Sequence, residues 1–163
     1  MKIGIYGGSF NPIHYGHTGL AIWVLNHTDL DELWLMISPN NPLKDASILA
    51  DQYVRLHKAQ ETIQQLGDKA NGIKVSDFEF QLPLPNYTAN TLRELKKVFP
   101  EHEFSLIIGE DNLEIFTQWR EYRYILENYR VIVYPRKGCN KIAQEMINIL
   151  RADNFKEIQI LQD

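Results

Sequence analysis

Two histidines three positions apart follow the first apolar run of the chain, in the stretch GGSFNPIHYGH (7–17). If a helix begins near Tyr15, His14 and His17 share a face of its first turn, and Gly16 leaves the space above that face open. Imidazoles donate hydrogen bonds to phosphate oxygens and carry positive charge when protonated. The spacing therefore predicts a site that holds a phosphate group while its charge changes.

The glycines ahead of the histidines favour the same interpretation. Gly7 and Gly8 let the backbone approach an anion closely. A helix beginning near Tyr15 would direct its first N–H groups and the positive end of its dipole toward the same place. A plain tight turn explains GGSFNP equally well by itself. The paired histidines favour a functional loop over that turn.

Two other chemistries fit this loop less well. A zinc site needs three or four ligands. The remaining histidines, His27, His57 and His102, show no pairing pattern, so we expect no protein-held metal. The loop also lacks the G-x-G-x-x-G pattern of dinucleotide-binding folds, which leaves hydride transfer without support.

Composition narrows the class of protein. The 163 residues, 44% apolar and 23% charged, predict a single globular domain over 1–163. A net charge of −4 argues against a nucleic-acid-binding protein. The single cysteine, Cys139, fits a reducing compartment. Neither a signal peptide nor a run of about 20 apolar residues is present, so we expect a cytoplasmic protein that binds no membrane.

Short apolar runs alternate with helical patterns along the chain. The runs predict strands at 2–6, 32–37, 73–76, 104–109, 130–135 and 157–161. Helices are expected from Tyr15, at 51–66 between an Asp51 cap and a Gly67 stop, from Asn90, and at 110–117, 122–128 and 140–151. This alternation predicts an α/β fold: a Rossmann-like, doubly wound parallel sheet of five to six strands with helices on both faces.

The position of the loops matters for function, because ligands of such sheets bind beyond the carboxyl ends of the strands. Two long loops, 38–50 and 77–89, follow predicted strands. Long loops in compact domains tend to be functional. We therefore expect the site to be completed by residues of these loops.

The stretch GGSFNPIHYGH resembles the signature of the nucleotidylyltransferases that carry an H-x-G-H motif. Its opening GGSF and its Pro12-Ile13-His14 resemble the nicotinate-nucleotide adenylyltransferases in particular, whereas phosphopantetheine adenylyltransferases usually have P-G-S-F and a threonine in place of His14. Five further segments follow in the order of the family: SPNNPLK (38–44), DQYVRLHKA (51–59), YTANTL (87–92), IIGEDNLEIFTQW (107–119) and VYPRKG (133–138). Six segments in order with correct spacing are specific.

The resemblance implies ATP and nicotinate mononucleotide as substrates and gives roles to matching positions. The implied catalytic residues are His14, His17 and Lys44. The implied ATP-binding residues are Gly8, Ser9, Phe10, His14, His17, Gly109 and Arg136, and the implied residues for the second substrate are Thr88, Thr91, Asp111 and Trp119. Each position also has a purely structural explanation. Lys44 and Arg136 could be solvent-exposed surface residues, and Thr88 and Thr91 could cap a helix. Asp111 could be an acid favoured in a first helical turn, and Trp119 could pack in the core.

The implied reaction is adenylyl transfer, which yields nicotinate adenine dinucleotide and pyrophosphate in NAD biosynthesis, with Mg²⁺ arriving on ATP. Two alternatives stay open: a related transferase acting on nicotinamide mononucleotide, and a non-catalytic module that binds pyridine nucleotides. The family ends in an I-S-S-T-x-I-R segment that binds ATP phosphates, and we expect 1–163 to lack it. Asn11 replaces a common aspartate, with little expected effect. The sequence does not indicate an oligomeric state.

Overall fold

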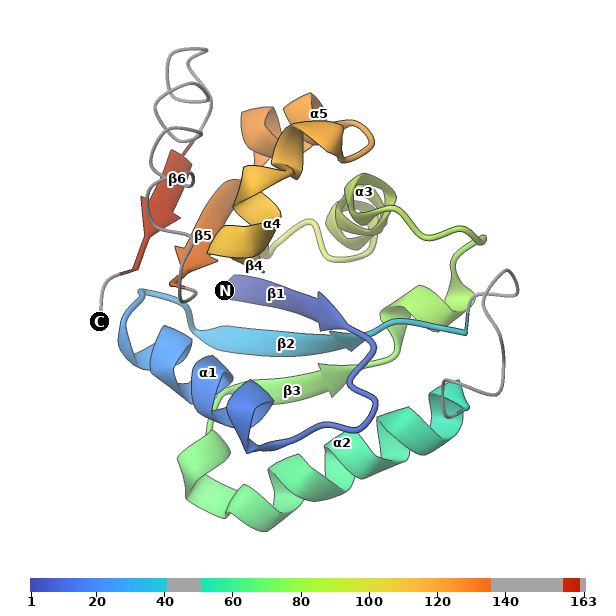
Figure 1. Ribbon diagram of the computed structural model, residues 1–163, viewed down its shortest axis with the longest axis vertical. Helices are drawn as coiled ribbons and strands as arrows, with labels where there is room; N and C mark the ends of the chain where they lie inside the picture. Colours follow the sequence, from blue (N-terminus) through green and yellow to red (C-terminus); the bar gives the residue numbers. More distant parts are fainter. Residues whose placement is uncertain (41–50, 136–156, 162–163) are drawn as a thin grey trace. The chain divides into compact units, whose positions relative to one another are not determined.

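The computed structural model describes residues 1–40, 51–135 and 157–161 (Figure 1). They form two compact units, Met1–Asn86 and Tyr87–Asp163. Each unit contains three parallel strands, and helices lie between them in the described residues.

The first unit holds the strands β1 (Lys2–Gly8), β2 (Glu32–Ile37) and β3 (Ile73–Ser76), in the order β3-β2-β1. The connections are α1 (Tyr15–Asn26), α2 (Gln52–Leu66) and the short 3-10 helices η1 (Gly67–Ala70) and η2 (Phe78–Gln81). The parallel register pairs Gly8 with Ile37, so β1 and β2 end side by side. The loops that leave these two strands therefore start as neighbours.

The ends of α2 follow the prediction made from its cap residues. The Asp51 side chain accepts a hydrogen bond from the Tyr53 N–H at 2.9 Å, which satisfies one of the unpaired donors of the first turn. Gly67 follows the last turn with φ of 58°, a conformation that glycine adopts without steric cost. Both ends of the helix are thus fixed by local sequence.

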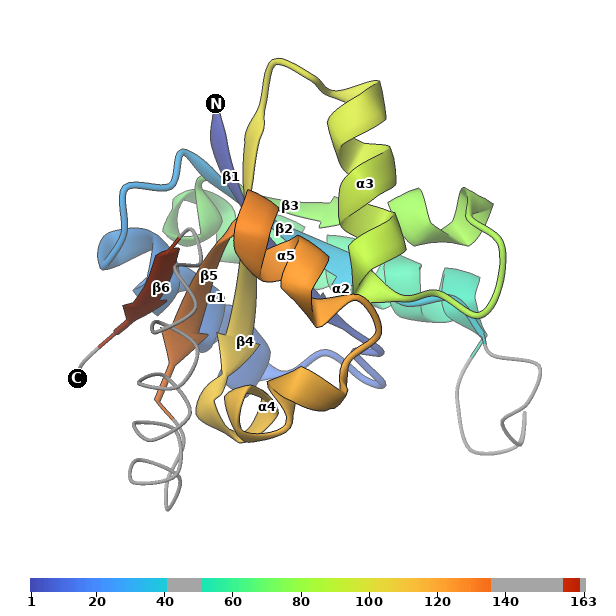
Figure 2. The ribbon, with the colours of Figure 1, turned by 90° about the horizontal axis from the view of Figure 1, so that it is seen from above.

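The second unit holds β4 (Glu103–Gly109), β5 (Arg130–Tyr134) and β6 (Glu157–Ile160), in the order β4-β5-β6. Its helices are α3 (Thr88–Val98), α4 (Glu110–Glu114), the 3-10 turn η3 (Phe116–Gln118) and α5 (Tyr122–Asn128), and Figure 2 shows them from above. The register pairs Gly109 with Tyr134. The carboxyl ends of β4 and β5 therefore meet.

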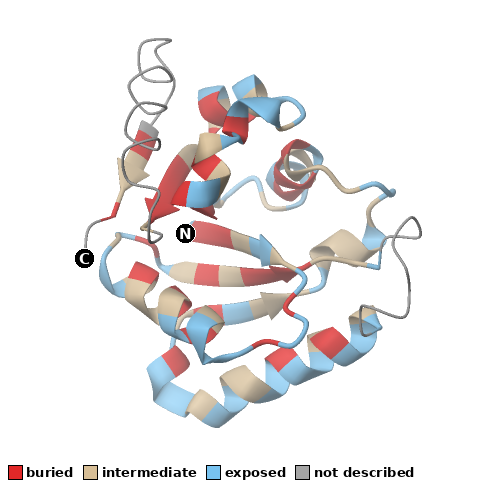
Figure 3. Ribbon diagram, viewed as in Figure 1, coloured by how far each residue is buried: buried red, intermediate tan, exposed pale blue. Residues whose placement is uncertain are grey.

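The burial pattern matches an α/β sheet covered on both faces. In β4 every residue after Glu103 is buried. The strands β1, β2 and β5 carry runs of buried residues as well (Figure 3). Strands buried on both faces need such continuous apolar runs. Six parallel strands and intervening helices confirm the predicted α/β class. Within the described ranges, no helix is both long and apolar enough to cross a membrane.

Two helices differ from their predicted bounds. α3 begins at Thr88 rather than near Asn90, since its cap residue Tyr87 makes no side-chain bond that a sequence pattern could reveal. The predicted helix at 110–117 ends at Glu114 and continues as η3. The helix predicted at 140–151 lies outside the described residues.

Candidate functional site

The loop after β1 turns sharply at Phe10, which has φ of 48° although it is not glycine. Its ring is buried, with 3% of its surface exposed. The ring packs edge-on against Tyr6 at 5.5 Å and against His17 at 4.9 Å between ring centroids. The buried Phe10 ring thus holds the loop against Tyr6 and His17. The neighbouring Ser9 is exposed to solvent. Phe10 supports the His17 ring through its own side chain, a role that the family pattern did not predict.

His14 and His17 form a capping box at the start of α1. The His14 Nδ1 accepts the Gly16 N–H at 3.0 Å, and the His17 Nδ1 accepts the His14 N–H at 3.1 Å. Their rings stack at 3.8 Å between centroids. A capping box normally pairs Ser or Thr with Glu or Gln, so here the imidazoles supply both acceptors.

This geometry assigns the tautomer of both rings. A nitrogen that accepts a backbone N–H carries no proton, so the proton of each neutral imidazole lies on Nε2. In its neutral form each ring is therefore a hydrogen-bond donor through Nε2–H. The N–H groups of Gly16 and His17 are used within the turn, by the His14 ring and the His14 carbonyl. Contrary to the expectation from the sequence, these two N–H groups bond within the turn and do not point at a ligand site.

Gly16 is needed for this arrangement. A Cβ at position 16 would lie 2.7 Å from Cε1 and 2.8 Å from Nδ1 of His14. Such contacts are essentially never seen, so any side chain would displace the His14 ring. The open space that the sequence predicted beside Gly16 is occupied by the His14 imidazole.

Lowering the pH should weaken the capping box. Burial lowers the pKa of His17 below its usual 6.5, and electrostatic repulsion from the adjacent His14 ring lowers it further. Between the folded and unfolded pKa values the unfolded chain binds more protons. The contribution of His17 to stability is therefore complete above about pH 6.5 and declines as the pH falls through the folded pKa.

Chemical unfolding at about pH 7.5 and about pH 5.5 measures this effect. Acidification should cost the wild type more stability than His17→Gln, because glutamine keeps an acceptor at this position but does not titrate. Equal losses in the two proteins would contradict the proposed tautomer.

The end of β2 is tied to the end of β1. Ser38 donates to the Gly8 carbonyl twice, through its N–H at 2.9 Å and its hydroxyl at 3.2 Å. Lys44 follows this point in the sequence and lies outside the described residues, as does Arg136. Their roles stay predictions.

In the second unit, Gly109 ends β4 and Asp111 lies exposed in the first turn of α4. A Cβ at Gly109 would lie 2.5 Å from the Asp111 Oδ1 and 2.9 Å from the Tyr134 ring. Glycine therefore allows the Asp111 carboxylate and the Tyr134 ring to close around the strand end. The structure brings Gly109 and Asp111 together at the carboxyl edge, where the sequence placed them.

Thr88 and Thr91 both lie in the first turns of α3, and neither caps it, because the cap residue is Tyr87. Thr91 is 2% exposed, and its hydroxyl donates to the Tyr87 carbonyl at 3.4 Å. Thr88 is only half-buried at the first helical position. Of the two, Thr88 is the more accessible to a ligand.

Trp119 follows η3 and is half-buried. Its ring tilts at 39° against the buried Phe116, with 4.9 Å between centroids. The packing interpretation and the stacking interpretation are thus compatible, since Phe116 supports the indole while part of the indole stays accessible.

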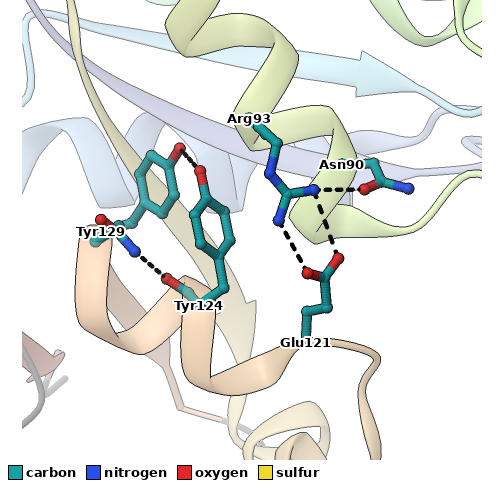
Figure 4. Close-up of polar contacts among 6 residues, drawn as sticks. Asn90, Arg93, Glu121, Tyr124 and Tyr129 are labelled. Atoms are coloured by element: carbon teal, nitrogen blue, oxygen red, sulfur yellow. Dashed lines mark hydrogen bonds and ion pairs between the residues drawn. The ribbon is translucent and has the colours of Figure 1, made fainter.

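A polar cluster fixes the turn after Trp119 (Figure 4). Glu121 has φ of 55° and accepts from Arg93 of α3 at 2.9 and 3.5 Å. Arg93 also donates to Asn90 and lies 4.3 Å from the centroid of the Tyr124 ring. The cluster joins the Trp119 turn to α3, which carries Thr88. Sequence reasoning missed it, because charged residues 28 positions apart give no local signal.

Comparison with known proteins identifies the family. The sequence model of the cytidylyltransferase-like family matches residues 5–160. A protein of Flavobacterium psychrophilum named "probable nicotinate-nucleotide adenylyltransferase" is 46% identical over 148 residues, which cover 91% of this chain and 75% of that protein. A protein of the same name from Flavobacterium johnsoniae is 48% identical over 136 residues, covering 83% of this chain and 68% of that protein. The chain belongs to the nicotinate-nucleotide adenylyltransferase family.

The fold agrees with that family. The structure of Plasmodium falciparum nicotinic acid mononucleotide adenylyltransferase complexed with NaAD superposes with a TM-score of 0.80. It is 23% identical, and the alignment covers 98% of this chain and 74% of that one. The likeness confirms a Rossmann-like fold for this nicotinate-nucleotide adenylyltransferase family member. The members of this family are nucleotidyltransferases, so the chain belongs to a family of enzymes.

The described residues offer no cluster of side chains for a metal ion. In the part of the chain that the structure describes, no three His, Cys, Asp or Glu side chains gather where they could hold a metal ion. A nicotinate-nucleotide adenylyltransferase works on nucleotides whose phosphate oxygens themselves bind hard cations. We therefore assign no described side chain as a metal ligand.

Proposed function

We propose that this chain transfers the adenylyl group of ATP to nicotinate mononucleotide, giving nicotinate adenine dinucleotide and pyrophosphate in NAD biosynthesis. The names of the relatives support this activity, and the Plasmodium enzyme of similar fold was solved in complex with NaAD. The observation that carries the proposal is the capping box, which turns two imidazoles into neutral Nε2–H donors after β1.

The transfer moves charge between phosphates. A 5′-phosphate oxygen of nicotinate mononucleotide attacks the α-phosphorus of ATP. The bond from that phosphorus to the oxygen bridging it to the β-phosphate breaks, and its electron pair leaves with pyrophosphate. The attacking oxygen is already an anion, so the reaction needs no general base and no covalent intermediate. The chain has to position two anions and stabilise the growing charge on the leaving group.

His14 and His17 are proposed to donate their Nε2–H groups to the phosphate oxygens that gain charge. Fixed donors of this kind need no reorganisation at the moment of reaction. Lys44 would add a point charge to the same phosphates. Mg²⁺ is expected to arrive on ATP, held by phosphate oxygens and water, and we assign no step to a protein-held ion.

The remaining proposals follow the positions in the fold. Gly8, Ser9 and Phe10 would hold the nucleotide through the loop after β1, with Gly109 and Arg136 as further ATP-binding residues. Thr88, Thr91, Asp111 and Trp119 would bind nicotinate mononucleotide. A single nucleotidyltransferase domain over 1–163 stays a prediction. We propose a cytoplasmic location, in keeping with the single cysteine of the chain.

Trp119→Ala should raise KM for nicotinate mononucleotide by about 5- to 100-fold, because stacking on an aromatic side chain contributes roughly 1–3 kcal/mol per base. KM for ATP should change little. Steady-state kinetics at saturating ATP measures the effect, and Trp119→Phe should keep most of the affinity. Losses confined to KM for ATP would contradict the assignment of Trp119.

A pyrophosphate-release assay tests the proposed function. The chain is incubated with ATP and, in turn, nicotinate mononucleotide, nicotinamide mononucleotide and phosphopantetheine. We expect release with nicotinate mononucleotide above the other two. Preference for nicotinamide mononucleotide would move the chain to a related transferase, and dinucleotide binding without release in any mixture would identify a non-catalytic module.

A further inference from the structure

Arg55 of α2 is among the most completely buried side chains of the described residues, with 1% of its surface exposed. Arginine is almost never fully buried unless its donors are satisfied. Burial also lowers its pKa, which Asp51 partly opposes. Burying a guanidinium removes its hydration, so its donors must be satisfied by specific acceptors in the protein.

The guanidinium reaches the two loops that leave β1 and β2. Its Nη1 donates to the Ser9 carbonyl and to the Ser38 carbonyl, both at 2.8 Å. Its Nη2 donates to the Asn40 side-chain oxygen, also at 2.8 Å. These acceptors lie 46, 17 and 15 positions away in the sequence. One planar group thus holds three oxygens from two separate loops.

The three acceptors lie outside the strands, within the first residues after β1 and β2. Ser9 is the exposed residue directly after β1 and precedes the turn at Phe10. Ser38 is the first residue after β2, and it is already bonded to Gly8. The chain that continues past Asn40 leads to Lys44. The guanidinium therefore fixes the start of both loops at once.

We propose that Arg55 is a positioning residue for ATP binding, which holds Ser9 in the loop after β1 and residues 38–40 directly after β2 in the geometry that receives the phosphates. The proposal rests on the proposed function. Arg55 acts through Ser9, Ser38 and Asn40. Only the planar fork of arginine, with donors in fixed directions, meets three oxygens at this spacing, and the compact ammonium of lysine does not replace it.

Arg55→Lys tests the proposal, with ATP affinity measured by titration calorimetry on the whole chain. We expect the Kd for ATP to rise about 10- to 100-fold, as befits the loss of charge-assisted hydrogen bonds. In steady-state assays KM for ATP should rise in parallel, while KM for nicotinate mononucleotide changes little. Asn40→Ala is the milder variant, since it removes one exposed acceptor, and it should weaken ATP binding several-fold.

The control is Ala59→Gly, one turn along the same helix. Ala59 is completely buried, and glycine in a helix interior lowers stability by an amount that thermal unfolding will show. This variant should unfold at lower temperature and bind ATP like the wild type. If Arg55 served stability alone, Arg55→Lys would behave in the same way, with a lower Tm and an unchanged Kd.

The two proposals fail in different ways. A wild-type chain that binds ATP but forms no dinucleotide would overturn the proposed function and leave the Arg55 comparison intact. An Arg55→Lys chain that binds ATP as tightly as the wild type would overturn the role of Arg55, whatever the reaction. A wild-type chain that binds no ATP would overturn both.

Discussion

Replacing His17 by alanine should lower kcat for dinucleotide formation by about 10²- to 10³-fold, the scale of losing one fixed donor to a developing oxyanion. The structure gives the reason, because the Nδ1 of His17 is held by the His14 N–H and its Nε2–H remains as the donor. KM for either substrate should change much less than kcat. Steady-state kinetics with ATP and nicotinate mononucleotide measures both.

Two controls separate chemistry from folding. His17→Gln keeps an acceptor for the His14 N–H, so it should recover the stability lost in His17→Ala but not the rate. His57→Ala removes an exposed histidine of α2 and should leave the rate unchanged. If His17→Ala kept more than about a tenth of the wild-type kcat, the loop would not have the catalytic role proposed for it.

Gly16→Ala should cost about 10²-fold in kcat, although alanine is the better helix former. The new Cβ would lie 2.7 Å from the His14 ring, so the imidazole must move and its bond from the Gly16 N–H is lost. A misplacement of about 1 Å at a reacting centre is enough for a loss of this size. Kinetics and thermal unfolding should be measured on the same preparation.

Gly19→Ala is the matched control in the same helix. A Cβ at Gly19 would meet nothing within 4 Å, so this variant should gain about 0.5–1 kcal/mol of stability and keep its activity. Equal rates for Gly16→Ala and Gly19→Ala would show that the position of the His14 ring does not matter for catalysis.

Local sequence predicted the helices and strands well where an apolar run or a capping residue marks them. Continuous apolar runs located all six strands, and Asp51 and Gly67 marked the ends of α2. The start of α3 was misplaced because Tyr87 offers no capping side chain. The helix predicted at 110–117 was too long because nothing in its composition indicates the change to a 3-10 turn after Ile115.

The sequence predicted which residues of the loop after β1 belong to the candidate site, but not how their side chains are arranged. Spacing placed His14 and His17 on one face, but only the structure shows that both rings use Nδ1 to cap α1. The segment DQYVRLHKA contains Arg55, but the role of Arg55 was missed because two of its three acceptors are backbone carbonyls, which any residue type would supply. Long-range contacts of this kind arise from the fold and leave no local pattern.

Nitrogen NMR of labelled histidine rings, recorded while ATP is added, tests the role of the two imidazoles without any substitution. We predict that Nδ1 of His14 and His17 stays unprotonated at neutral pH and that the Nε2–H signals of both rings shift as ATP binds. Bound ATP that leaves both Nε2–H signals unmoved would contradict the proposed contact between these rings and the phosphates.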